Sequence, residues 1–140
     1  MNSPYYYNNS IQQDRCRQPL ILAVDDNEDN LQLLSQLLVL LDCKFITAAD
    51  GESTLAMADH QPDLILLDMM LPDLSGIEVV HRLKQNPKTS HIPVIAVTAM
   101  ARQEDRDRFI LAGCIDYVKK PYIIDEMEAI ILRYVCRDVV

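Results

Sequence analysis

Short apolar runs alternate with longer mixed stretches along most of this sequence. The runs lie at residues 20–24, 44–48, 64–67, 92–97 and 114–118. An unbroken apolar run of this length is typical of a β-strand that is buried on both faces, as in a parallel sheet. The third run is the clearest, because four aliphatic residues are followed at once by the carboxylate of Asp68. Taken alone, Asp68 is equally compatible with a helix cap or a turn.

The stretches between these runs predict helices. They cover residues 27–41, 51–58, 77–85, 101–112 and 124–134. The first stretch is rich in leucine at helical spacing, with one face formed by Leu31, Leu34, Leu38 and Leu41 and widened by Leu33, Leu37 and Leu40. We therefore expect this helix to be well buried. The stretch 101–112 carries many charges and predicts a weakly amphipathic helix, with Gly113 as its C-cap.

Five alternations of strand and helix predict the fold class. Such a chain forms an α/β domain, with a doubly wound parallel sheet flanked by five helices. The 140 residues suffice for one domain with a proper core. Residues 1–18 are rich in Asn, Gln, Ser and Tyr without a helical or strand period, so we expect a flexible N-terminal tail. The predicted organisation is a tail at 1–18 and one domain at 19–140.

The charge balance excludes some classes of partner. The chain has 21 acidic and 13 basic residues and a formal net charge of -8, which disfavours binding to nucleic acid or to anionic membranes. No apolar run approaches the roughly 20 residues that span a bilayer. The four cysteines contain no C-x-x-C pair, which favours buried thiols and a reducing, cytoplasmic location.

Polar residues of a particular kind follow four of the predicted strands. Asp25-Asp26 follow the first, Asp68 ends the third, Thr98 ends the fourth, and Lys120-Pro121 follow the fifth. In a parallel sheet these strand ends lie along one edge, so three carboxylates would crowd together and need a cation. Oxygen ligands with open positions suit Mg²⁺, and a lysine with a hydroxyl suits a phosphoryl group. Each of these residues alone could be an ordinary cap or turn residue. Folding does not require all of them together, so their joint occurrence favours a functional site.

In these motifs the chain resembles a receiver domain of a two-component response regulator, of the chemotaxis-type single-domain kind. The segments that carry the resemblance are Val24-Asp25-Asp26-Asn27, Leu67-Asp68-Met69-Met70-Leu71-Pro72 with Gly76, Val97-Thr98-Ala99, and Tyr117-Val118-Lys119-Lys120-Pro121. The resemblance covers residues 20–137. It implies a flavodoxin-like sheet with strand order 2-1-3-4-5.

The resemblance also implies a role for each site residue. Asp68 would be the phosphoacceptor, attacking the phosphorus of a phosphohistidine to give an acyl phosphate. Asp26 would bind Mg²⁺ directly and Asp25 mostly through water, with Asp68 and the Met70 backbone carbonyl completing the protein ligands. The chain would therefore be a phosphoacceptor that assists its own phosphotransfer and dephosphorylation, rather than an enzyme.

Further positions would hold the phosphoryl group and report its arrival. Lys120 would pair with the phosphoryl oxygens, and Thr98 and Ala99 would also contact them. Movement of Thr98 would let Tyr117 turn inward as the switch aromatic. The family usually has a cis peptide bond before the proline that corresponds to Pro121.

The resemblance implies partners and a tuning of the acyl-phosphate lifetime. The donor would be a sensor histidine kinase or a phosphotransfer protein. A downstream protein would bind the changed surface of the helix 101–112, the last strand and the last helix, and this face could instead form a homodimer. The positions two past Asp68 and two past Thr98 are Met70 and Met100, whose apolar chains cannot orient a hydrolytic water, so we expect slow self-dephosphorylation.

Two other functional classes stay open at this point. A haloacid-type Mg²⁺-dependent phosphatase also uses a strand-end aspartate, but it has a second Asp two residues later, where this chain has Met70. A flavodoxin-like electron carrier needs a phosphate-binding loop after the first strand, and Asp25-Asp26-Asn27-Glu28 would repel a flavin phosphate.

Overall fold

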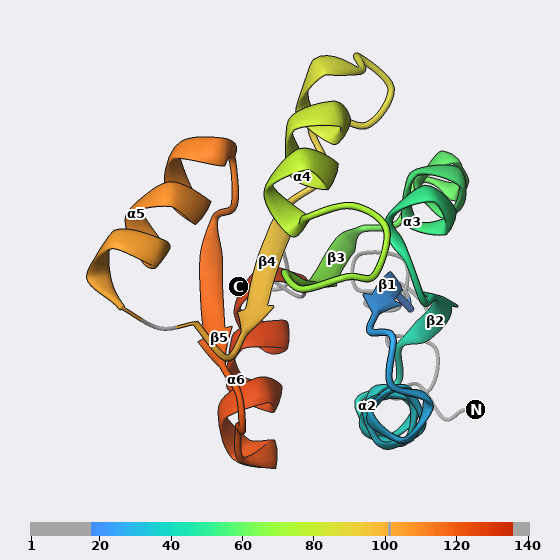
Figure 1. Ribbon diagram of the computed structural model, residues 1–140. Helices are drawn as coiled ribbons and strands as arrows, with labels where there is room; N and C mark the ends of the chain where they lie inside the picture. Colours follow the sequence, from blue (N-terminus) through green and yellow to red (C-terminus); the bar gives the residue numbers. More distant parts are fainter. Residues whose placement is uncertain (1–17, 101, 136–140) are drawn as a thin grey trace, which may run out of the picture.

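Five parallel strands form one sheet between two layers of helices in the computed structural model, which describes residues 18–100 and 102–135 (Figure 1). The strands are β1 (Leu20–Val24), β2 (Lys44–Ala48), β3 (Leu64–Asp68), β4 (Val94–Thr98) and β5 (Asp116–Lys119). The helices are α2 (Glu28–Leu40), α3 (Gly51–Met57), α4 (Gly76–Gln85), α5 (Gln103–Ala112) and α6 (Ile124–Val135), with a 3₁₀ turn, η1 (Ala58–His60). The strand order is β2-β1-β3-β4-β5, which confirms the predicted fold class and topology.

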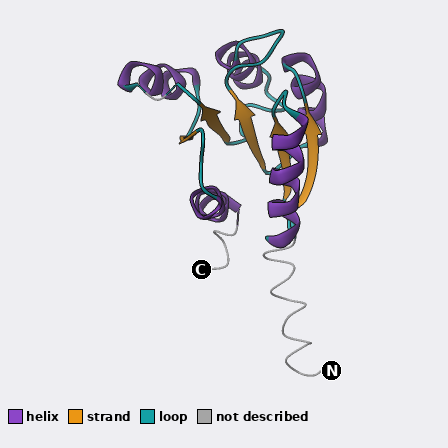
Figure 2. Cartoon of the chain, turned by 60° about the horizontal axis from the view of Figure 1, so that its bottom comes forward, coloured by secondary structure: helices purple, strands orange, loops and turns teal. Residues whose placement is uncertain are grey.

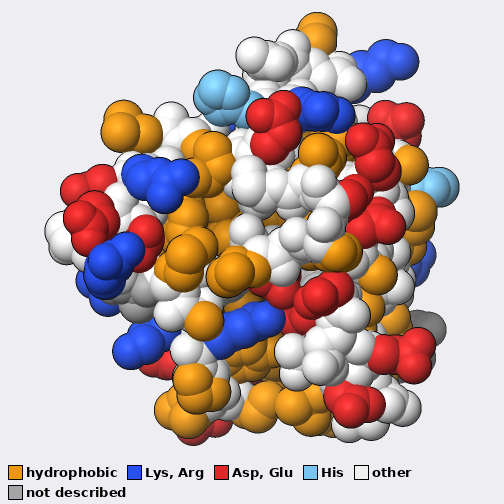
Figure 3. Space-filling view, viewed as in Figure 1, with side chains coloured by type: hydrophobic (Ala, Val, Ile, Leu, Met, Phe, Trp, Pro, Cys, Tyr) orange, Lys and Arg blue, Asp and Glu red, His pale blue; other side chains and the backbone are white. Residues whose placement is uncertain are grey.

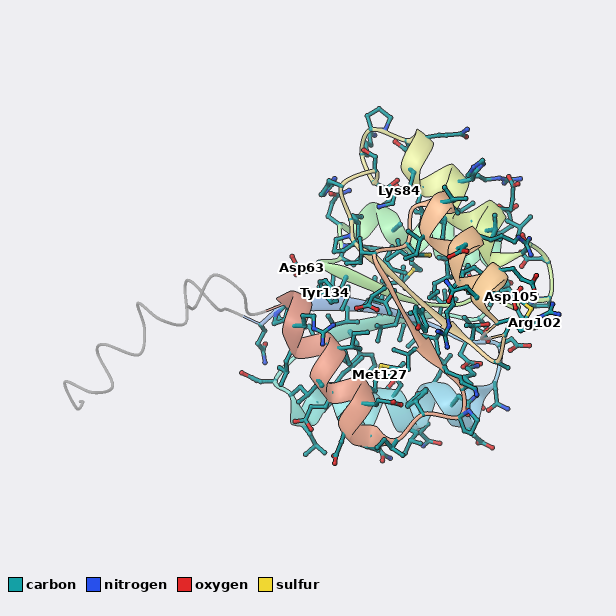
Figure 4. All side chains as sticks on the ribbon, turned by 90° about the vertical axis from the view of Figure 1, so that its left-hand side faces the viewer. Asp63, Lys84, Arg102, Asp105, Met127 and Tyr134 are labelled. Carbon is teal, nitrogen blue, oxygen red and sulfur yellow. The ribbon has the colours of Figure 1, made fainter. Side chains whose placement is uncertain are left out.

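Each face of the sheet has its own apolar core. α3, α4 and α5 cover one face, and α2 and α6 cover the other (Figures 1 and 2). Successive strand residues point to opposite faces, so Leu22 belongs to the first core and Ile21 to the second. Met127 lies on the side of α6 that faces the sheet (Figure 4). The central strand β3 is buried along its whole length, and Asp68 ends it.

Two strands begin later than the apolar runs predict, because their first residues close the preceding turns. The Ile92 N–H donates to the Thr89 carbonyl across 3.1 Å, so β4 begins at Val94. The Cys114 N–H donates to the Phe109 carbonyl across 3.0 Å and closes the end of α5. Gly113, with φ of 125°, is the predicted C-cap of that helix.

The prediction that the whole leucine-rich face of α2 is buried is wrong. Leu34, Leu37 and Leu38 are buried, whereas Leu33 is 52% exposed and Leu40 is 82% exposed. A helix that lies on the surface of a sheet buries only the face that contacts the strands, and α2 has leucines beyond that face. The apolar count of a helix therefore overstates how much of it is covered.

Some predicted features lie at the limits of the described part of the chain. The tail lies outside the described residues except for Gln18, whose side-chain amide donates to Asp42 across 2.7 Å. Cys43 and Cys114 are buried thiols, as expected, and the other two cysteines lie outside the described residues. Within the described ranges, no helix combines the length and the apolar character needed to cross a membrane.

Candidate functional site

The register of the sheet brings the strand-end carboxylates together. Val24 pairs with Leu67, so Asp25 and Asp68 leave neighbouring strands side by side. Both residues are buried, with exposures of 6% and 5%, whereas Asp26 is exposed. One carboxylate oxygen from each of the three aspartates lies within 4.8 Å of the other two. The predicted crowding of acids at this edge is therefore present.

One lysine bridges the two buried carboxylates. The Lys120 Nζ donates to Asp25 Oδ2 across 2.9 Å and to Asp68 Oδ2 across 3.2 Å. Burial opposes the charge on Lys120, but the hydrogen bonds and attraction from Asp25 and Asp68 outweigh it and raise the lysine pKa. Burial raises the pKa of Asp68, and the Met70 N–H and Lys120 only partly offset this. The carboxylates of the cluster together carry more negative charge than the single positive charge of Lys120 can balance.

Backbone and amide donors fix the orientation of the two acids. The Asn27 N–H donates to Asp25 Oδ1 across 2.9 Å, and the Asn30 side-chain amide donates to Asp25 Oδ2 across 3.2 Å. The Met70 N–H donates to Asp68 Oδ1 across 2.9 Å. Asn30 was not among the residues predicted for the site. Its only sequence signal is its position one turn after the cap residue Asn27, on the first turn of α2.

The hydroxyl predicted for phosphoryl recognition ends β4. Thr98 is fully buried, and its Oγ1 accepts the Met100 N–H across 2.9 Å. Its carbonyl accepts the Lys120 N–H across 2.7 Å, which links the residue to the bridging lysine. Ala99 follows at the surface. The peptide bond between Lys120 and Pro121 is cis.

The predicted switch residue has a partner that the sequence did not indicate. Tyr117 is half-buried in β5, and the Arg106 guanidinium lies 4.7 Å from the centre of its ring. Within residues 18–100 and 102–135, the buried Arg106 Nε has no hydrogen-bond partner, and the guanidinium stacks on the Tyr117 ring. The contact joins α5 to β5, and no local sequence pattern reports such a tertiary contact.

A cleft of about 460 Å³ adjoins the acidic cluster. Residues 69–75, which connect β3 to α4, form most of its wall, and Asp26 and Met100 complete it. In the space-filling view, hydrophobic side chains gather between α4 and α5, and acidic side chains gather towards α3 (Figure 3). The exposed carboxylate of Asp26 lines this cleft, so a ligand bound there would contact the acidic cluster at its exposed member.

The three aspartates also meet the requirements of a divalent cation. They supply hard oxygen ligands at mutual distances within 4.8 Å, and one of them opens to solvent. Three carboxylates with one lysine leave an excess of negative charge that a divalent cation would balance. The donor set therefore fits Mg²⁺.

Comparison with known proteins identifies the family that has this architecture. The family described as "Response regulator receiver domain" matches residues 21–132. The chain belongs to this family. The receiver domain is the phosphoacceptor module of two-component signalling rather than an enzyme of the ordinary kind, and receiver domains work with histidine kinases and phosphotransfer proteins.

Individual relatives agree with this assignment. The polar-differentiation response regulator DivK of Brucella anthropi is 39% identical over 115 residues, which cover 81% of this chain and 94% of that protein. The receiver domain of the sensor histidine kinase PA1611 from Pseudomonas aeruginosa PAO1, solved with a magnesium ion in its active-site cleft, is 33% identical. Its TM-score is 0.77, and the match covers 84% of this chain and 98% of that one.

A third comparison concerns a receiver domain in a complex. One chain of the co-crystal structure of the Saccharomyces cerevisiae phosphotransfer protein Ypd1 with the receiver domain of Ssk1 matches with a TM-score of 0.79. The identity is 25%, and the match covers 88% of this chain and 92% of that one. Membership of the receiver family decides against the haloacid-type phosphatase and the electron carrier.

Proposed function

We propose that Asp68 is the phosphoacceptor of this receiver domain. The observation that supports this most directly is the Lys120 bridge, which places a cation against the buried carboxylate of Asp68. An Asp68 oxygen would attack the phosphorus of a phosphohistidine. The new O–P bond forms as the P–N bond breaks, and the imidazole leaves with the electron pair of that bond. The product is an acyl phosphate on Asp68.

Asp25, Asp26 and Asp68 are the side chains that would hold Mg²⁺, together with the Met70 backbone carbonyl. Bound Mg²⁺ would supply charge neutralisation for the phosphoryl oxygens. The chain's own contribution is to keep the carboxylates in position, through the N–H groups of Asn27 and Met70 and the amide of Asn30. The PA1611 receiver domain supports the assignment, because it holds a magnesium ion coordinated in its active-site cleft.

The remaining site residues would bind the phosphoryl group. The Lys120 Nζ, freed from Asp68, would pair with a phosphoryl oxygen as a point charge. The Thr98 hydroxyl would donate to another oxygen, and the Ala99 backbone N–H would contribute a further donor. Because Thr98 is buried at the end of β4, its movement towards the phosphoryl group would change the packing beside Tyr117.

Phosphorylation would change the face formed by α5, β5 and α6, and this face would carry the signal to a partner. α5, β5 and α6 line a hollow of about 490 Å³, to which they contribute Arg106, Tyr117 and Arg133 respectively. Inward rotation of Tyr117 would remove its ring from Arg106 and change this surface, which a downstream protein would bind. The same face is a candidate for homodimer formation.

The phosphoryl donor would be a sensor histidine kinase or a phosphotransfer protein in the cytoplasm. The complex between Ypd1 and the Ssk1 receiver supports a phosphotransfer protein as one class of donor. In this proposal residues 19–140 are the receiver domain and residues 1–18 are a tail outside it. The net charge of -8 argues against a nucleic-acid partner.

A small phosphodonor tests the assignment of Asp68. The intact chain is incubated with acetyl phosphate and Mg²⁺, and its mass is measured. We expect the gain of one phosphoryl group, abolished by Asp68→Asn and by chelation of Mg²⁺. An intact chain that gains no mass, or an Asp68→Asn variant that gains as much as the wild type, would refute the proposal.

A further inference from the structure

The loop between β3 and α4 is closed at its base by backbone contacts. Met70 and Ser75 form an antiparallel bridge, and the Gly76 N–H donates to the Met69 carbonyl across 3.0 Å. A Cβ at Gly76 would lie 2.6 Å from the Met69 Cα, so only glycine permits this approach. These contacts fix the two ends of the loop relative to each other, but they do not attach the loop to α3.

The tip of the loop is fastened to α3 by the carboxylate of Asp73. Its Oδ1 accepts the Gly51 N–H across 2.7 Å, and its Oδ2 accepts the Glu52 N–H across 3.0 Å. The Leu74 N–H of the loop also donates to Oδ1, across 2.8 Å. The hydrogen bond from Gly51, with those from Glu52 and Leu74, holds the pKa of Asp73 below its usual value. A single carboxylate thus joins two elements that are far apart in sequence.

α3 does not depend on Asp73 for its N-cap. Asp50 is the N-cap residue, and its Oδ1 accepts the Ser53 N–H across 2.8 Å in a complete capping box. Asp73 instead takes the two amides that this box leaves unsatisfied in the first turn. Leu74 adds to the attachment, since a Cβ at Gly51 would lie 2.8 Å from the Leu74 Cβ.

We propose that Asp73 is a positioning residue for the phosphoacceptor site. It holds the 69–75 loop against α3, so that the backbone of Met70 keeps its place beside Asp68. Met70 donates its N–H to Asp68 and, in the proposed function on which this inference rests, offers its carbonyl to Mg²⁺. α3 serves here as a fixed support and contributes no group to the site itself.

The variant Asp73→Ala should loosen the loop and weaken the metal site. We expect the Mg²⁺ dissociation constant, measured by isothermal titration calorimetry, to rise on the order of three- to tenfold, which is the effect of losing about one hydrogen bond. Amide hydrogen exchange of Met70 and its loop neighbours should be faster than in the wild type. Asp73→Asn keeps one acceptor for the Gly51 N–H. Its Mg²⁺ dissociation constant and its amide exchange rates should therefore lie between those of the wild type and those of Asp73→Ala.

Asp50→Ala is the matched control. It removes the other carboxylate that accepts an N–H group from the first turn of α3, but it leaves the loop contacts of Asp73 in place. We expect it to lower stability in urea without changing Mg²⁺ affinity or the exchange of the loop amides. Should Asp73→Ala and Asp50→Ala change stability alike and both leave Mg²⁺ affinity unchanged, Asp73 would be a helix cap only and the proposal would be overturned.

Two further outcomes are separable. If Asp73→Ala does not fold, the metal titration of Asp73→Asn decides, and wild-type affinity and exchange in that variant would overturn the proposal. Neither readout depends on phosphoryl transfer. A wild type that binds Mg²⁺ but gains no phosphoryl group would therefore refute the proposed function while leaving this test of Asp73 valid.

Discussion

Replacing Lys120 by methionine tests the electrostatics of the site most directly. At an effective dielectric constant of 20, the attractions across 2.9 Å and 3.2 Å are about 6 and about 5 kcal/mol. Much of this is offset by the cost of removing the ions from water. Without the lysine, Asp25 and Asp68 repel each other across at most 4.8 Å, by at least about 3.5 kcal/mol at the same dielectric constant.

The expected loss of unfolding free energy in Lys120→Met is about 3 kcal/mol. This is the lower end of the usual cost of breaking a buried pair, because 23% of the Lys120 side chain is exposed and partly screened by solvent. The variant should also bind Mg²⁺ more tightly than the wild type, since Lys120 no longer competes for the oxygens of Asp25 and Asp68.

Urea unfolding with a chelator and then with Mg²⁺ measures both effects, because the added ion stabilises the folded state according to its affinity. Lys119→Met is the control: it removes the same charge from the adjacent, exposed position and should change stability little. A loss below about 1 kcal/mol in Lys120→Met, or weaker Mg²⁺ binding than in the wild type, would show that the lysine does not balance these acids.

Four other experiments each have a defined expected result. Burial raises the pKa of Asp68 above 3.8, so without Mg²⁺ its contribution to stability is fully present below pH 3.8 and is lost as pH rises through the raised pKa; the stability of Asp68→Asn in urea unfolding should therefore gain on that of the wild type over this rise, and a difference that does not change with pH would contradict this. Arg106→Met should cost about 0.5–1 kcal/mol and shift the ring resonances of Tyr117, which would stay unchanged if the stacking were unimportant. Burial raises the pKa of the Cys114 thiol to about 12, so this thiol should resist iodoacetamide at pH 8 until the chain unfolds, as followed by mass spectrometry; equal labelling of native and unfolded chain would contradict it. The acyl phosphate should outlast seconds and become shorter-lived in Met70→Asn, as measured by loss of radiolabel; a wild-type lifetime of seconds would refute the slow self-dephosphorylation.

The sequence predicted the sheet and the edge at which the site lies, because these depend on local patterns. Continuous apolar runs indicate strands that are buried on both faces, and in a parallel sheet their ends fall together. Asp25, Asp68 and Lys120 were therefore expected at one edge, where the structure has them in contact. The mixed stretches between the apolar runs likewise predicted helices that alternate with the strands.

The contacts that support the site residues could not be predicted from the sequence, because they join elements that are distant in sequence. Asp73 looks like an ordinary turn residue in a Pro- and Gly-containing loop, and only the fold brings it to the amides of Gly51 and Glu52. Arg106 looks like one of many charges on a weakly amphipathic helix. The overestimated burial of α2 has a related cause, since the apolar pattern of a helix does not say how wide a face the sheet will cover.

The chain order of the site has a consequence for fragments. The loop between α4 and β4, residues 86–93, lies at the edge of the sheet opposite the acids, and the carboxylates precede it whereas Thr98 and Lys120 follow it. A chain cleaved there would give two pieces, neither holding a complete site, that meet along the pairing of β3 with β4. Phosphoryl uptake by the mixture would then show that the two fragments had reassembled into a domain with a complete site.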